Sequence, residues 1–222
     1  MCGIVGYIGE EQAAPILLEG LSRLEYRGYD SAGVAVYGGG AMQVRKAKGR
    51  LSVLDGLLDH GKALEGVVGV GHTRWATHGA PSDVNSHPQV SRSGKIAVVH
   101  NGIIENYVQL RSFLQEQGVS FVSETDTEVV AQLVAYFYED GRVDILEAVG
   151  RCLRRIEGAY ALGILCADTP DRLIAVRKDS PLILGLGEGC TFLASDVTAI
   201  LRHTREVIYL DDGETAVLTQ EG

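Results

Sequence analysis

Apolar residues recur along the chain at two spacings, which predict strands alternating with helices. A short apolar run over residues 2–8 ends at Gly9 and predicts a strand. Leucines and alanines then recur three and four positions apart behind Pro15, which predicts a helix, and Gly28 stands where a glycine often ends one. Further predicted elements are a hairpin of 31–37 and 42–47, a short helix at 53–58, buried strands at 67–70 and 96–99, helices at 130–137 and 146–156, and strands at 160–166, 173–177, 182–186, 191–194, 207–210 and 215–218.

The order of these elements predicts the fold class. Strands gather at both ends of the chain with helices between them, and short turns join many of the strand pairs. This order predicts a largely antiparallel α+β sandwich. A chain of 222 residues with no repeat and no linker is expected to form one domain. A polar loop with Pro81, Asp83, Asn85 and Pro88 separates two buried strands, and long loops often carry function.

Composition narrows the possible partners. The formal net charge is −9, which argues against nucleic acid or an anionic membrane as the main partner. The longest strongly apolar stretch, 160–167, is far shorter than the roughly 18 residues of a membrane helix. The first residues lack the pattern of a secretory signal, so we expect a cytoplasmic protein. The four cysteines lack CxxC spacing and are expected to be free thiols, three of them inert in apolar surroundings.

Cys2 is a candidate nucleophile. A thiol with its ordinary pKa of about 8.5 is mostly protonated at neutral pH and needs a base. Removal of Met1 would make residue 2 the chain terminus, and its α-amine, with a pKa of about 7.7–8.0, would be a base attached to the nucleophile. Gly3 would let a substrate approach closely. The alternative is that Cys2 is a small buried hydrophobic residue.

A second catalytic arrangement pairs Cys2 with a histidine. The partners would be His100 with Asn101, or else His78. Such cysteines usually begin a helix, where the dipole favours the thiolate, whereas Cys2 begins an apolar strand. Substitution of each candidate histidine (His72, His78, His87 and His100) would decide between the two arrangements.

Polar residues follow two of the predicted buried strands. Arg74 lies in the stretch 71–79 and is suited to hold a carboxylate, although it also fits a surface arginine packed on Trp75. In the stretch 100–106, the amide of Asn101 and the N–H of Gly102 would suit an oxyanion hole, although Asn-Gly is also a common turn signal.

A third polar stretch, 123–128, precedes a predicted helix. Thr125 and Glu128 have the spacing of a capping box, with Asp126 in the first turn. Asp126 would then either stabilise the helix dipole or pair with a substrate ammonium, complementing an arginine that holds the carboxylate of the same amino acid. No metal-ligand spacing, GxGxxG or P-loop is found, so we expect no metal and no cofactor.

Five stretches together resemble the class II glutamine amidotransferases, which are N-terminal nucleophile hydrolases. They are MCGIVGYIG at 1–9, EYRGYDSAG at 25–33, HTRWATHG at 72–79, HNGIIEN at 100–106 and SETDTE at 123–128. The resemblance covers the chain and implies a four-layer αββα fold. It implies Cys2 as nucleophile and base in a glutaminase that forms a thioester and releases ammonia and glutamate. It implies that Asn101 and Gly102 form the oxyanion hole, that Arg74, Thr77, His78, Gly102 and Asp126 bind glutamine, and that Trp75 and Arg27 surround the site.

The amino-acid sequences of these stretches resemble most the branch of this family that makes glucosamine-6-phosphate from fructose-6-phosphate. The full enzymes of that branch carry two sugar-isomerase modules and are expected to be homo-oligomers, so residues 1–222 are interpreted as a glutaminase domain without those modules. Retained Met1 would turn the amine into an amide and give an inactive form. Alternatives are a domain of the amidophosphoribosyltransferase or asparagine synthetase type and a non-catalytic glutamine-sensing module. His87 either belongs to a surface that responds to phosphosugar or is simply solvated.

Overall fold

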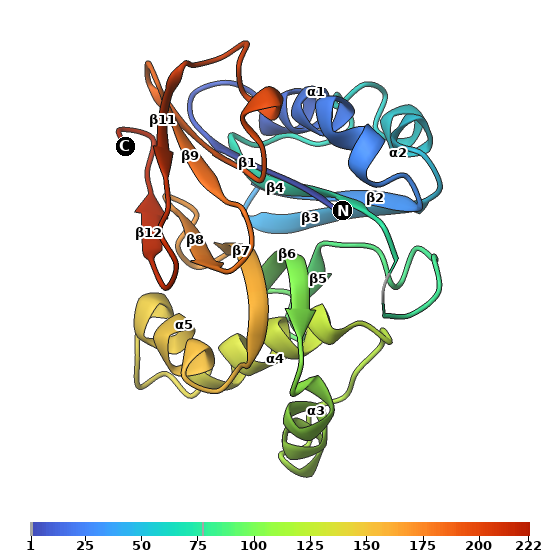
Figure 1. The fold of residues 1–222 in the computed structure, drawn as a ribbon, viewed down its shortest axis with the longest axis vertical. Coiled ribbons are helices and arrows are strands. Elements are labelled where there is room, and N and C mark those ends of the chain that lie inside the picture. The colour runs from blue at the N-terminus through green and yellow to red at the C-terminus, as the bar shows by residue number, and fades with distance from the viewer. Residues whose placement is uncertain (1, 77) are drawn as a thin grey trace.

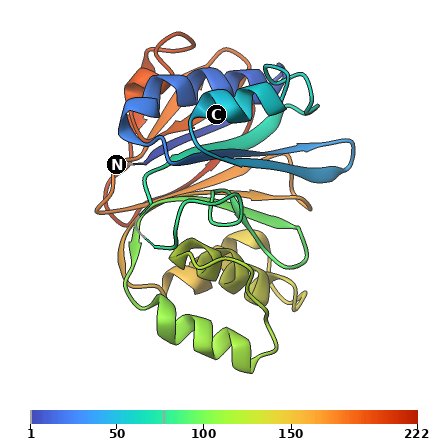
Figure 2. The same ribbon diagram turned by 90° about the vertical axis from the view of Figure 1, so that its right-hand side faces the viewer.

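Two antiparallel sheets lie face to face, and helices cover the outer face of each (Figures 1 and 2). The computed structural model describes residues 2–76 and 78–222. Its layers run helix, sheet, sheet, helix, which confirms the predicted α+β sandwich.

The larger sheet has seven strands in the order β11-β9-β10-β1-β4-β2-β3. Strand β1 lies in its middle and pairs antiparallel with β10 on one side and β4 on the other. The strands are β1 (Gly3–Ile8), β2 (Ser31–Gly38), β3 (Ala41–Lys48), β4 (Val68–Arg74), β9 (Ile183–Gly187), β10 (Cys190–Ala194) and β11 (Glu206–Tyr209). The start of the chain is therefore held from both sides.

The smaller sheet has five strands in the order β12-β8-β7-β6-β5, and β6 pairs with β7 over nine residues. The strands are β5 (Gln89–Val90), β6 (Ile96–Ile104), β7 (Gly158–Cys166), β8 (Leu173–Lys178) and β12 (Thr215–Leu218).

Helices α1 and α2 cover the larger sheet, while α4 packs on β5 and β6 of the smaller one and contacts α3 and α5 (Figure 1). Their bounds are α1 (Ala13–Leu24), α2 (Leu51–Leu57), α3 (Tyr107–Glu116), α4 (Asp126–Tyr138) and α5 (Ile145–Leu153), with 3-10 turns at Glu25–Arg27 and Val197–Ala199. Helix α4 is buried along most of its length because it contacts the sheet as well as the other two helices. No helix within the described ranges is long and apolar enough to cross a membrane.

Alternation along the strands divides the core into three apolar layers. In β6, Ile96 and Val98 face the helices, whereas Ala97 and Val99 face the opposite sheet. In β4, Val68 and Val70 lie in the same layer between the sheets as Ile4 of β1. Full burial of such a side chain contributes about 1.5–3 kcal/mol, so these layers fix which face each strand turns inward.

Four details differ from the sequence predictions. Helix α3 was not predicted, because only Leu110 and Leu114 of its ten residues are buried and so sparse a pattern gives little periodicity. The two-residue strand β5 was also not predicted. Gly28 ends a 3-10 turn in an extended conformation, with φ −164°, so it is not a left-handed helix-ending glycine. Strands β4 and β6 are longer than predicted and include His72, Arg74 and Asn101.

The predicted capping box is only half present. Thr125 is the N-cap of α4, and its hydroxyl accepts the Glu128 N–H at 3.3 Å. The Glu128 carboxylate does not return to the Thr125 N–H, as a capping box requires, but accepts the N–H groups of Val122 and Ser123. The Ser123 hydroxyl accepts the Thr125 N–H instead. The Glu128 side chain therefore stabilises the loop that precedes α4 and does not bond to the N-cap residue.

Candidate active site

A cavity of about 350 Å³ lies at the edge of the sandwich where β1 begins and where β4 and β6 end. Alternation explains which side chains reach it. His72 continues the face of Val68 and Val70 that points between the sheets, and Asn101 continues the corresponding face of Ala97 and Val99. Cys2 precedes Ile4 by two positions and so shares its face. The layer between the sheets thus changes from apolar to polar at this edge.

The Cys2 thiol is half-buried beside the backbone of Trp75. Its Sγ accepts the Trp75 N–H at 3.2 Å and lies 3.5 Å from the Trp75 carbonyl oxygen. Burial raises the pKa of the Cys2 thiol, while the Trp75 N–H and the charge of Arg74 oppose that rise. Since burial prevails, the thiol rests protonated and needs a base in order to react.

None of the four candidate histidines bonds to this thiol. Among residues 2–76 and 78–222, the hydrogen bonds of Cys2 Sγ go to Trp75 alone. His72 and His100 bond elsewhere: Nε2 of His72 faces two oxygens, and Nδ1 of His100 lies 2.9 Å from the Thr127 hydroxyl. This geometry gives no support to the Cys-His alternative.

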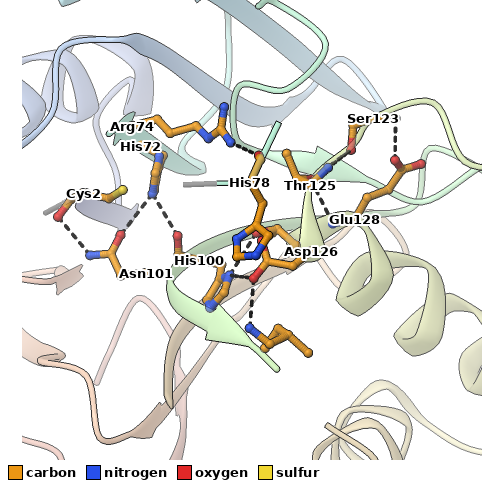
Figure 3. Close-up of polar contacts among 12 residues, drawn as sticks. Cys2, His72, Arg74, His78, His100, Asn101, Ser123, Thr125, Asp126 and Glu128 are labelled. Atoms are coloured by element: carbon orange, nitrogen blue, oxygen red, sulfur yellow. Dashed lines mark hydrogen bonds and ion pairs between the residues drawn. The ribbon is translucent and has the colours of Figure 1, made fainter. Parts of the chain in front are cut away.

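Asn101 and Gly102 lie on β6. Asn101 lies beside Cys2, which directly precedes β1 (Figure 3). The Asn101 Nδ2 donates to the Cys2 carbonyl oxygen at 3.1 Å, and its Oδ1 lies 3.0 Å from His72 Nε2. Gly102 has φ +127°, and a Cβ built on it would lie 2.0 Å from the Ala159 carbonyl oxygen. No other residue fits there without displacing β7, so this Asn-Gly pair is part of a strand and not a turn.

Arg74 ends β4 and is buried, which excludes the surface arginine considered from the sequence. Its Nη2 donates to the carbonyl oxygens of His78 and Gly79, the latter at 3.2 Å. Its Nη1 is buried and finds no acceptor within the described residues. One side of the guanidinium therefore holds the loop after β4, and the other is available to a carboxylate.

Asp126 is the first residue of α4 and is also buried. Its Oδ2 accepts the Ile104 N–H at 2.9 Å and lies 3.9 Å from His100 Nδ1. These contacts tie the start of α4 to the end of β6 and place the carboxylate at the cavity wall. The cavity thus has a carboxylate on one wall and a guanidinium on another.

Comparisons with known proteins identify the family. A profile described as the glutamine amidotransferase domain matches residues 72–202, which is more than half of the chain. The chain belongs to the glutamine amidotransferase domain family. A glutamine--fructose-6-phosphate aminotransferase (isomerizing) of Caldanaerobacter subterraneus is 60% identical over 221 residues, covering 100% of this chain and 36% of that protein. The protein of that name from Clostridium perfringens is 58% identical over 222 residues, with the same shares.

Solved structures extend the likeness to the fold. A glutamine phosphoribosylpyrophosphate amidotransferase from B. subtilis superposes with a TM-score of 0.85 at 27% identity, covering 100% of this chain and 48% of that one. The chain accordingly spans little more than a third of the curated relatives it matches and about half of this structural neighbour. The likeness confirms the predicted membership of the glutamine amidotransferases.

The structure brings most of the predicted site residues of this amidotransferase domain to one cavity. Its walls include Cys2, Arg27, Arg74, Trp75, Asn101, Gly102 and Asp126. Trp75 is 46% exposed and meets the ring of Tyr29 edge-on at 5.3 Å, while Arg27 pairs with Asp196. His78 does not line the cavity, because its ring lies against Tyr107 at 5.3 Å. Thr77 lies outside the described residues, as does Met1.

His87 corrects one prediction. One of its two alternatives, a solvated loop histidine, is wrong. His87 is buried, and its ring lies 4.3 Å from that of His72 and 6.5 Å from that of His100. Gly33 allows this burial, since a Cβ there would lie 2.2 Å from the His87 carbonyl oxygen. Burial lowers the pKa of His87 well below its usual value, so its ring is neutral at physiological pH.

Sequence reasoning named Asn85 only as part of a polar loop and missed that its side chain joins two segments of the site. Its Nδ2 donates to the Ala80 carbonyl oxygen at 2.9 Å and to Glu124 Oε2 at 3.2 Å, and its Oδ1 accepts the Glu124 N–H at 3.0 Å. The loop after Arg74 is thereby held beside the entry to α4. A single asparagine in a polar loop gives no sequence signal of such a contact.

In the part of the chain that the structure describes, no group of three His, Cys, Asp or Glu side chains is placed to hold a metal ion. The site offers a thiol, amide and backbone donors, a guanidinium and a carboxylate. These are the groups needed to bind an amino acid and to attack a carbonyl carbon with sulfur.

Proposed function

We propose that this domain hydrolyses the side-chain amide of L-glutamine to glutamate and ammonia. The observation that carries the proposal is the convergence of Cys2, Asn101, Arg74 and Asp126 on one cavity in a chain of this family. The first two groups suit acyl transfer at an amide, and the last two suit the ends of an amino acid.

The proposed reaction begins after Met1 has been removed. The α-amine of residue 2 accepts the thiol proton, and the Cys2 sulfur bonds to the amide carbon of glutamine. The negative charge that develops on the amide oxygen is stabilised by Asn101 Nδ2 and the Gly102 N–H. The amine then returns its proton to the nitrogen, ammonia leaves, and a γ-glutamyl thioester remains. Water adds to this thioester, the carbon–sulfur bond breaks, and glutamate and the free thiol are released.

Substrate recognition is assigned to the opposite walls of the cavity. Arg74 Nη1 would bind the α-carboxylate of glutamine, and Asp126 would bind its ammonium group. The proposal retains Thr77 in binding glutamine and gives His78 an indirect part, because its backbone carbonyl oxygen accepts a hydrogen bond from Arg74. Trp75 and Arg27 lie at the edge of the site. Both charges are buried, so they would act with little screening by water.

In the whole protein, we assign residues 1–222 to the glutaminase part of an enzyme that aminates fructose-6-phosphate to glucosamine-6-phosphate. Support comes from the names of relatives 58–60% identical over the entire chain, against 27% for the phosphoribosylpyrophosphate enzyme. Sugar-isomerase modules would lie outside these residues. The four cysteines are free, which suits a reducing cytoplasm. The homo-oligomer stays a prediction.

The test uses chain from which Met1 has been removed, verified by intact mass. Glutamate and ammonia should form from glutamine in equal amounts, and 6-diazo-5-oxo-L-norleucine should add once, at Cys2. A matched sample that retains Met1 should do neither, because its residue 2 carries an amide in place of an amine. Processed chain that leaves glutamine intact and the analogue unbound would contradict the proposal, and would favour a glutamine-sensing module.

A further inference from the structure

His72 is fully buried on β4, which pairs with β1 in the larger sheet, and its ring faces β6 of the smaller sheet (Figure 3). Its Nε2 lies 3.0 Å from the His100 carbonyl oxygen and 3.0 Å from Asn101 Oδ1. The mechanism above uses Asn101 but assigns no role to this histidine.

The neighbours of His72 decide where its proton sits. A backbone carbonyl oxygen can only accept a hydrogen bond, so Nε2 must carry the hydrogen that faces His100. Burial lowers the pKa of His72 to about 3, so the ring is neutral at physiological pH and carries only this one proton. Nδ1 is then bare, and it finds no partner among the described residues. The tautomer is thereby fixed.

The fixed tautomer in turn decides the orientation of the Asn101 amide. The Asn101 atom that faces the His72 N–H must be an acceptor, which is Oδ1. The amide nitrogen therefore lies on the other side, where it donates to the Cys2 carbonyl oxygen at 3.1 Å. A flipped amide would set NH₂ against an N–H and oxygen against a carbonyl oxygen. Both contacts would be repulsive. The contact with His72 and the contact with Cys2 therefore favour the same orientation of the Asn101 amide.

We propose that His72 is a positioning residue that holds the Asn101 amide with its nitrogen toward the reacting carbonyl of the substrate. The inference deepens the proposed function and rests on it. Asn101 Nδ2 has two hydrogens; one is bound to the Cys2 carbonyl oxygen, and the second remains for the oxyanion in the cavity that Asn101 lines. Without His72, the amide is free to turn its oxygen toward a developing negative charge.

The test compares two substitutions at residue 72. Leucine fills similar space without a donor, whereas the side-chain N–H of glutamine can replace the histidine Nε2–H. His72→Leu should lower kcat about 30-fold with KM changed less than threefold, and His72→Gln should restore kcat to within about fivefold of the original chain. Alkylation of Cys2 by iodoacetamide, which forms no oxyanion, should change less than twofold in both.

A double-mutant comparison separates positioning from a general structural role. In an Asn101→Ala background, His72→Leu should lower kcat less than twofold, because the group through which it acts is gone. An equal loss in both backgrounds would overturn the proposal, and so would a His72→Leu chain with unchanged kcat.

Nitrogen NMR of the unsubstituted chain reads the tautomer of His72 directly, and the folded His72→Gln chain is needed only to assign the signal. One histidine, absent from the His72→Gln spectrum, should keep its hydrogen on Nε2 and show no titration between pH 5 and 8. A hydrogen on Nδ1, or titration in that range, would overturn the inference. If the unsubstituted chain leaves glutamine intact, the proposed function fails, while this spectrum still tests the contact between His72 and Asn101.

Discussion

The two halves of the candidate site are held in different ways. The strand half consists of Cys2, His72 and Asn101. The pairing of β4 with β1 and of β6 with β7 fixes the backbones of His72 and Asn101, and Cys2 directly precedes β1. The loop half consists of residues 78–88 with Asp126 at the start of α4. Side chains hold this half in place, among them Arg74, Asn85 and Lys46.

This difference predicts that substitutions in the two halves of the site change different kinetic constants. Strand pairing holds the reacting groups to within fractions of an ångström, as bond formation requires. A loop held by a few side chains can tighten around an amino acid but also loosens when one contact is lost. Changes in the strand half should therefore lower kcat, and changes in the loop half should mainly raise KM.

The largest effect is expected from Cys2→Ala in the strand half. Loss of the sulfur removes the covalent route, so kcat for glutamate release should fall about 10⁴-fold or more. Cys190→Ala is the matched control, since Cys190 is a half-buried thiol outside the cavity, and its kcat should stay within about twofold. Measurable turnover by Cys2→Ala chain within about 100-fold of the original would remove Cys2 from the mechanism.

Gly102→Ala should have the next largest effect. Its Cβ would lie 2.0 Å from the Ala159 carbonyl oxygen, so β6 must shift and carry the Gly102 N–H out of place. Loss of one oxyanion donor typically costs about 10²–10³-fold in kcat. Gly94→Ala controls for positive φ alone, because Gly94 has φ +77° and open space around it, and should cost about 1–2 kcal/mol of stability with kcat unchanged. Equal kcat in both variants would contradict the role of the clash.

Asn85→Ala tests the loop half. It removes the contacts that hold Ala80 beside Glu124, so KM for glutamine should rise about 10-fold, the equivalent of ~1.4 kcal/mol, with kcat within threefold. Asn106→Ala is matched in chemistry, since Asn106 also bridges two segments, at Arg155 and Glu157. The Asn106→Ala substitution should lower the melting temperature of the chain and leave KM for glutamine unchanged. A fall in kcat with constant KM in Asn85→Ala would reverse the assignment of the two halves.

The smallest effect concerns Lys46, whose ammonium donates to the Val84 and Pro88 carbonyl oxygens of the loop. Burial lowers the pKa of Lys46 from 10.5 to about 8, against the pull of Glu128 and Asp83. Between these values the unfolded chain binds more protons than the folded one, so this group makes the free energy of unfolding rise with pH from about 8 to 10.5. Lys46→Met should flatten that rise in denaturant titrations at pH 7 to 10.

Lys48→Met, an exposed neighbour on the same strand, should keep the slope of the original chain. A slope that survives in Lys46→Met would place the titrating group elsewhere. Neither substitution should change kcat more than about threefold, because neither side chain reaches the cavity.

Sequence spacing predicted the fold well because the strands are short apolar runs with inward faces that alternate, as in Val68 and Val70 of β4. It also singled out Cys2, Arg74, Asn101 and Asp126, whose side chains the structure brings to one cavity. Chemistry that demands a thiol, an amide and opposite charges narrows the candidates even when the contacts between them are unknown.

The contacts themselves depend on pairing between distant segments and were beyond sequence reasoning. The role inferred for His72 depends on the register of β4 against β1 and on the contact between its side chain and β6. The residues next to His72 in the sequence encode neither of these. The burial of His87 depends on Gly33, more than fifty positions earlier. Helix α3 was missed because it buries only two side chains.

The central place of β1 has a consequence for how the protein is made. Residue 2 leaves the ribosome first, yet its strand acquires one neighbour only with residues 68–74 and the other only with residues 190–194. Pairings of such long range form late in folding. The thiol is thus the earliest part of the site to be synthesised and among the last to be set in place, so the site is complete only when nearly all of the domain has emerged.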